Sequence, residues 1–141
     1  MTPLRLTDIE AALRTSWGAD TADPRSAETW PPGNPERDQC GVTALVLNDL
    51  LGGELMVGEV YAGGERTGYH WWNRLASGFE IDLTRGQFLP GETVTDGAPV
   101  TRPPEIRHCR EQYELLRTRV LSRLAEQQGR DSRAPSAQAT S

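Results

Sequence analysis

Cys40 is the residue of this chain whose type and position best suit covalent chemistry. It follows a charged segment at residues 34–39 and opens an apolar stretch, CGVTALVLNDLL, that has the composition of a helix. The first turn of a helix carries partial positive charge and unpaired backbone N–H groups, which stabilise a thiolate. The same groups can hold the oxyanion that develops on an acyl substrate. Cys40 is therefore predicted to be a nucleophile of lowered pKa; the alternative is a core thiol that happens to begin a helix.

His70 is the better placed of the two histidines to act as a base for that thiol. It lies in GYHWWNRLASGFEIDLTRGQF, which is predicted to form a hairpin that turns at residues 76–78. In that register His70 and Asp82 share one face, at a diagonal separation that a hydrogen bond can bridge. Glu80 has the same parity but lies one pair further away, so it is the second choice. His108, in the arginine-rich stretch RHCRE, is expected at the surface. The alternative is an aromatic hairpin with a satisfied histidine and a solvent-facing Asp82.

Cysteine, histidine and aspartate in this order match the nucleophile, base and orienting carboxylate of a catalytic triad. The predicted reaction is attack of Cys40 on an amide, ester or thioester, followed by transfer of the acyl group to water or to an amine. The chain has 141 residues, which is short for a general protease and favours a small-molecule or peptide-like substrate. One rival hypothesis is a binding module in which the triad is idle. Another is a zinc site built from the same three residues, but no local pair of ligands marks it. No metal and no cofactor is predicted.

The elements that must position these residues follow an α+β order. A first helix is expected around Ile9 and Leu13, and residues 18–39 form a long irregular segment. A short helix at 42–51 is followed by strands at 54–61, 68–75 and 79–83, a loop at 84–100 and a last helix at 106–127. Residues 1–128 are predicted to form a single domain. Residues 129–141 have no apolar periodicity and are predicted to be a disordered tail.

Composition excludes several classes of function. The net charge is −5 and no basic stripe is present, so nucleic acid is not an expected partner. No run of about eighteen apolar residues exists, so no membrane span is expected. The N-terminus lacks the features of a signal peptide, and a cytoplasmic location with reduced thiols is therefore predicted. Two cysteines without CxxC spacing argue against a disulfide framework and a structural zinc site.

Two segments carry a resemblance to known proteins. NPERDQCGVTALVLNDLLGGEL together with HWWNRL…GFEIDLTRGQF resembles the YunG-like bacterial family, from Ser16 to Phe88. More distantly, the chain is similar to the papain-like and transglutaminase-like superfamily, in which the cysteine lies on a helix, the histidine on a strand and the aspartate or asparagine on the next strand. This resemblance implies a catalytic helix packed on a small antiparallel sheet, with roles for Cys40, His70 and Asp82.

The resemblance also implies an amide side chain shortly before the nucleophile that helps to bind the oxyanion. Gln39 is adjacent to Cys40 and Asn34 is six residues before it, and both remain candidates. Alternation along the strand places Trp72 on the face of His70, where it is expected to line the cleft, and directs Trp71 towards the core.

Overall fold

The computed structural model describes residues 5–24, 34 and 36–139 of the chain, and its helices and antiparallel strands confirm the α+β class. The helices are α1 (Leu6–Ser16), α2 (Cys40–Leu51) and α3 (Arg110–Ala139), with a short 3-10 helix η2 (Arg85–Gln87). The strands are β1 (Glu54–Ala62), β2 (Glu65–Arg74), β3 (Glu80–Ile81), β4 (Glu92–Val94) and β5 (Ala98–Val100). Within the predicted irregular segment, residues 25–33 and 35 lie outside the described residues.

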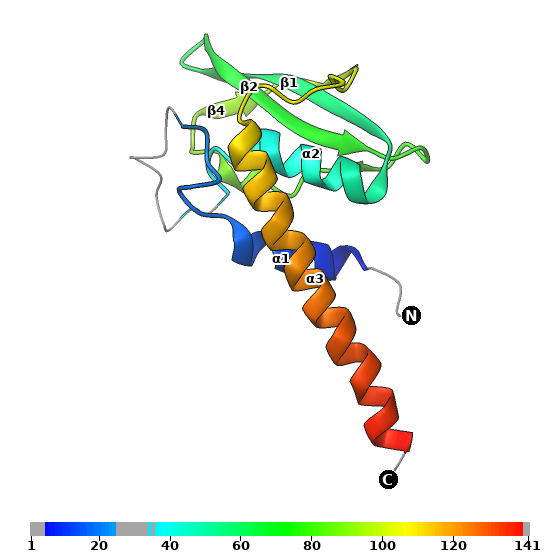
Figure 1. The fold of residues 1–141 in the computed structure, drawn as a ribbon. Helices are drawn as coiled ribbons and strands as arrows, with labels where there is room; N and C mark the ends of the chain where they lie inside the picture. Colours follow the sequence, from blue (N-terminus) through cyan, green and yellow to red (C-terminus); the bar gives the residue numbers. More distant parts are fainter. Residues whose placement is uncertain (1–4, 25–33, 35, 140–141) are drawn as a thin grey trace.

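Helix α2 lies between the sheet and the other two helices (Figure 1). Its buried residues are spread over more than one face because it has neighbours on both sides, which explains its apolar sequence. One core joins the three helices to the sheet, and its fully buried members include Ile9, Leu13, Leu47, Leu116 and Val120. Within the described part of the chain, no helix combines the length and the apolar character needed to cross a membrane.

Strand β1 is the centre of the sheet. The strand order is β3-β2-β1-β4, and β5 pairs with another part of β1. β1 and β2 form a long antiparallel hairpin that turns at Gly63 and Gly64, where both φ angles are positive. Glycine tolerates this conformation because it has no Cβ, and the resulting two-residue turn matches the twist of the strands.

The hairpin between β2 and β3 has the register that the sequence predicts. Asn73 pairs with Ile81, and the Leu75 N–H donates to the Phe79 carbonyl at 2.8 Å. β3 contains two residues rather than the predicted five at 79–83. Because β3 is so short, the outer edge of β2 before Asn73 is left to contact the start of α2.

The segment at residues 84–100 is more ordered than predicted. It was expected to be a loop, but it contains η2, β4 and β5, and both strands pair with β1. Each of these strands has three residues, which is too short for alternation to be recognised in sequence. The segment crosses the face of the sheet that carries His70.

Helix α3 differs from the prediction at both ends. It begins at Arg110 rather than 106, because Cys109 adopts a left-handed conformation with φ of 57° that no α-helix accommodates. It continues to Ala139, so residues 129–139 are helical rather than irregular as predicted; residues 140–141 lie outside the described part. Among the described side chains of α3, the last buried one is Leu124. The end of the helix projects away from the other elements (Figure 1).

Candidate active site

Cys40 is the first residue of α2, which begins two residues earlier than the predicted start at 42, and its thiol is half-buried at the outer edge of β2. The sulfur lies 4.0 Å from the carbonyl oxygen of Tyr69 and accepts a hydrogen bond from the backbone N–H of Trp71. The preceding turn ends with Asp38, whose φ of 60° reverses the chain just before the helix. The thiol is therefore held between a helix start and the free edge of a strand.

Burial raises the pKa of the Cys40 thiol to about 11, which corrects the predicted lowering. Desolvation is the largest cause, and the negative charges of Asp82 and Asp38 add to it. Hydrogen bonds from the Trp71 N–H and the Gln87 side chain act in the opposite direction but are outweighed. The thiol is consequently neutral at neutral pH and needs a base before it can act as a nucleophile.

His70 and Asp82 form the pair that the hairpin register predicts. His70 Nε2 lies 2.7 Å from Asp82 Oδ2, and the imidazole is 0% exposed. Since a carboxylate only accepts hydrogen bonds, Nε2 carries the proton and Nδ1 keeps a lone pair. Phe88 meets the imidazole edge-on at 4.8 Å, and Arg85 Nε also binds Asp82 Oδ2 at 2.7 Å. The histidine is thus fixed in one tautomer by its surroundings.

Gln87 joins the turn before α2 to the imidazole, and sequence reasoning missed it. Its Nε2 donates to the Thr84 carbonyl at 3.0 Å and lies 3.4 Å from His70 Nδ1, while its Oε1 accepts from the Asp38 N–H at 3.0 Å. Gln87 is 3% exposed and sits in η2. Cys40 and His70 both belong to the described part of the chain, and no hydrogen bond joins them directly. The signal available in the sequence was its place in DLTRGQF, five residues after Asp82.

A cavity of about 900 Å³ opens beside the thiol. Cys40 and Gln87 line it together with the aromatic side chains of Tyr69, Trp71 and Phe88. The segment that leads into α3 forms the opposite wall. The arrangement therefore gives a neutral thiol access to a space that is wide enough for a ligand and lined by aromatic groups.

A family comparison places this geometry in context. The model of the YunG protein family matches residues 5–125. The chain belongs to the YunG protein family. The matched region runs from α1 to the last buried position of α3, so the projecting end of α3 is outside it. No curated protein and no solved structure matches the chain.

The two amide side chains considered for the oxyanion are engaged elsewhere in this YunG family member. Gln39 is 0% exposed; its Oε1 accepts from the Thr21 hydroxyl at 2.7 Å and its Nε2 donates to the Gly18 carbonyl at 2.9 Å. Asn34 Nδ2 donates to the backbone carbonyl of Gln87 at 2.9 Å. Gln39 anchors the turn after α1, and Asn34 positions η2.

The two tryptophans of the HWWN stretch exchange their predicted surroundings. Trp72 shares the face of His70, as alternation predicts, but it is 4% exposed because the segment at 84–100 covers it. Gly97 packs directly against its indole ring, and the indole N–H donates to Glu80 Oε1 at 2.6 Å. Trp71 lines the cavity instead. Glu80, the second choice for the carboxylate, therefore serves Trp72 and not the histidine.

Proposed function

We propose that this YunG protein is a cysteine-dependent hydrolase or acyltransferase with a papain-like core. The observation that carries the proposal is the fixed imidazole of His70: Gln87 Nε2 lies 3.4 Å from its Nδ1, and Gln87 lines the same cavity as the Cys40 thiol. Asp82 holds the opposite nitrogen of the same ring at 2.7 Å. The cysteine on a helix, the histidine on a strand and the aspartate after the next strand follow the order of papain-like enzymes.

The raised thiol pKa determines how such a reaction proceeds. A resting thiolate–imidazolium pair is not favoured, so the proton moves from Cys40 to His70 Nδ1 as the sulfur attacks the acyl carbon. Asp82 stabilises the imidazolium through Nε2–H, and His70 then protonates the leaving group. Water or an amine releases the acyl group from the sulfur, with His70 again acting as the base.

Gln87 and the start of α2 supply donors for the oxyanion. The 3.4 Å separation between Gln87 Nε2 and His70 Nδ1 is long for an N–H···N bond, so a substrate can replace it at low cost. The backbone N–H of Cys40, in the first turn of the helix, is the second donor. Gln87 takes the role that the resemblance assigned to Gln39 or Asn34.

The cavity favours a small or peptide-like acyl substrate. Its volume of about 900 Å³ lies within the range of small-molecule sites. Tyr69, Trp71 and Phe88 offer apolar contact, and Arg37 and Arg66 also line the space.

A binding module with an idle triad is the second candidate. The observation that favours it is the neutral thiol, which makes Cys40 a weak nucleophile without help from His70. The two candidates differ in whether the imidazole removes the thiol proton during attack.

Reaction with p-nitrophenyl acetate separates the two candidates. We expect a burst of nitrophenol and an acetyl group on Cys40, located by peptide mass mapping. Cys109→Ser is the matched control and should keep the burst, whereas Cys40→Ser should lose it. A folded wild-type protein that forms no acetyl-Cys40 would instead support the binding module.

A further inference from the structure

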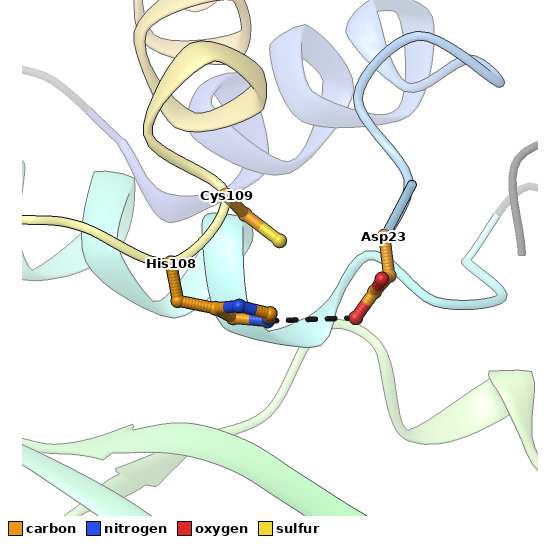
Figure 2. A group of neighbouring side chains, drawn as sticks. All are labelled: Asp23, His108 and Cys109. Carbon is orange, nitrogen blue, oxygen red and sulfur yellow. Dashed lines mark ion pairs between the residues drawn. The ribbon is translucent and has the colours of Figure 1, made fainter. Parts of the chain in front are cut away.

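A second group of cysteine, histidine and aspartate lies at the wall of the same cavity. Asp23 comes from the turn after α1, while His108 and Cys109 directly precede α3 (Figure 2). The carboxylate, imidazole and thiol point towards one another, and their ligand atoms all lie within 4.8 Å of each other. His108 Nε2 and Asp23 Oδ2 are 3.5 Å apart. None of these residues has a role in the proposed acyl transfer.

The separations suit a tetrahedral metal ion. Zinc binds cysteine sulfur at about 2.3 Å and histidine nitrogen or carboxylate oxygen at about 2.0–2.2 Å. Ligand atoms at the corners of such a tetrahedron are about 3.3–3.8 Å apart by the same bond lengths. The distance of 3.5 Å between His108 and Asp23 falls within this range. The thiol sulfur lies within 4.8 Å of the other two ligand atoms, so only small side-chain rotations would bring all three to an ion.

Backbone contacts that do not involve a metal already position two of the three ligand residues. The backbone N–H of Asp23 donates to the Asp38 carbonyl at 3.2 Å, which fixes the turn after α1 against the start of α2. The Cys109 carbonyl accepts from the Tyr113 N–H at 2.9 Å in the first turn of α3. Cys109 also has φ of 57°, a conformation uncommon outside glycine and frequent at functional sites. The backbones of Asp23 and Cys109 are therefore in place before an ion binds, and the exposed His108 side chain is the ligand that the ion orders.

We propose that Asp23, His108 and Cys109 form a binding site for a divalent transition-metal ion, best suited to Zn²⁺. Thiolate, imidazole and carboxylate together favour zinc, whereas magnesium and calcium prefer oxygen ligands alone. The Cys109 thiol releases its proton to solvent when it binds the ion. Three protein ligands leave a fourth position, and because all three residues line the cavity that position is open to a ligand within it. The proposal is independent of the function proposed for Cys40.

The spacing of the ligands explains why the sequence argued against zinc. His108 and Cys109 are adjacent, so they do not have the spacing of a zinc motif, and Asp23 lies near the opposite end of the chain. Only the fold brings the turn after α1 next to the start of α3.

Cobalt titration of the full-length reduced protein tests the site, because Co²⁺ reports both its ligands and its geometry. We expect a thiolate-to-cobalt charge-transfer band in the near ultraviolet and the intense visible bands of a tetrahedral ion, both removed by added Zn²⁺. Cys109→Ser should lose the charge-transfer band. His108→Ala and Asp23→Asn should each weaken cobalt binding by about tenfold or more.

Cys40→Ser is the matched control, since its thiol lines the same cavity, and it should bind cobalt as the wild type does. Zn²⁺ should also protect Cys109, but not Cys40, from iodoacetamide. The proposal is overturned if the wild type shows no charge-transfer band, if Cys40→Ser loses the band, or if His108→Ala and Asp23→Asn both bind cobalt as tightly as the wild type.

Discussion

A cysteine lies at the start of α2 and another directly before α3, and the two thiols line one cavity in different surroundings. Cys40 opens α2, which is enclosed between the sheet and two helices, whereas Cys109 directly precedes α3, whose far end projects from the fold. His70, the proposed base for Cys40, is fully buried. The side chain of His108, beside Cys109, is 75% exposed.

This difference shows that a helix start does not by itself decide what a cysteine does. Burial raises the pKa of Cys40 more than its hydrogen bonds lower it. A buried imidazole held by a carboxylate in one tautomer suits proton transfer with a nearby thiol. An exposed imidazole and a carboxylate that converge on a thiol suit capture of a cation. The two sites therefore call for separate experiments.

The largest expected effect separates the two histidines. Replacing His70 with Asn removes the proposed base, so the rate of acetyl transfer from p-nitrophenyl acetate should fall by about 10²–10⁴-fold. The matched change His108→Asn should leave the rate within about twofold, because His108 belongs to the other site. Equal losses in both variants would show that the His70–Asp82 pair is not the base. Thermal melting of each variant confirms that it is folded.

The second effect concerns the pH at which Cys40 reacts. The rate of iodoacetamide modification should rise with pH towards a midpoint near 11, since only the thiolate reacts and burial raises its pKa. In urea the midpoint should return to about 8.5. Asp38→Asn removes one of the nearby charges, and asparagine tolerates the left-handed backbone, so this variant should show a lower midpoint. A midpoint below the value in urea would restore the low pKa that the helix start predicts.

The raised pKa of Cys40 also makes folding stability depend on pH. The folded protein holds the Cys40 proton more tightly than the unfolded chain, so folding stability should fall as pH rises from about 8.5 towards about 11. The contribution is fully present below this window and lost above it. Cys40→Ala should unfold with a weaker dependence on pH between these values.

Sequence reasoning reached the parts of the site that depend on local geometry. The register of the second hairpin follows from the position of its turn, so the pairing of His70 with Asp82 was predictable and is confirmed. The helix after the charged segment was predictable from the change of composition, although α2 begins at Cys40 rather than at residue 42.

Features that depend on how distant segments meet were not predictable. Gln87 lies beside His70 because Asn34 and Arg37 hold its backbone carbonyl. The predicted surroundings of Trp72 were wrong because Gly97, which lies between β4 and β5, packs against its indole ring. The predicted lowering of the Cys40 pKa was wrong because the desolvation of a thiol depends on tertiary packing, which the position at a helix start does not reveal.

The third effect tests what holds the Cys40 site together. Gln87→Ala removes a buried side chain and leaves the part-buried N–H of Asp38 without its acceptor, which should lower the free energy of unfolding by about 1–3 kcal/mol. Gln112→Ala, on α3, is the matched control and should change it by less than about 0.5 kcal/mol. Urea denaturation measures both. Equal stabilities would mean that Gln87 does not connect the turn before α2 to the imidazole.

The smallest effect concerns the far end of α3. Truncation after Gln128 removes residues 129–141, which follow Leu124, the last buried position of α3 among its described side chains. It keeps the hydrogen bond between Gln127 and Asp8. An exposed helix end gains little from tertiary packing, so the melting temperature should change by less than about 2 °C. A matched truncation after Leu121 removes Leu124 from the core and should lower it by several degrees, since burying a leucine side chain contributes about 1.5–3 kcal/mol. A large loss in the first truncation would mean that α3 resembles α2 in being enclosed along its whole length, and the contrast between the two helices would fail.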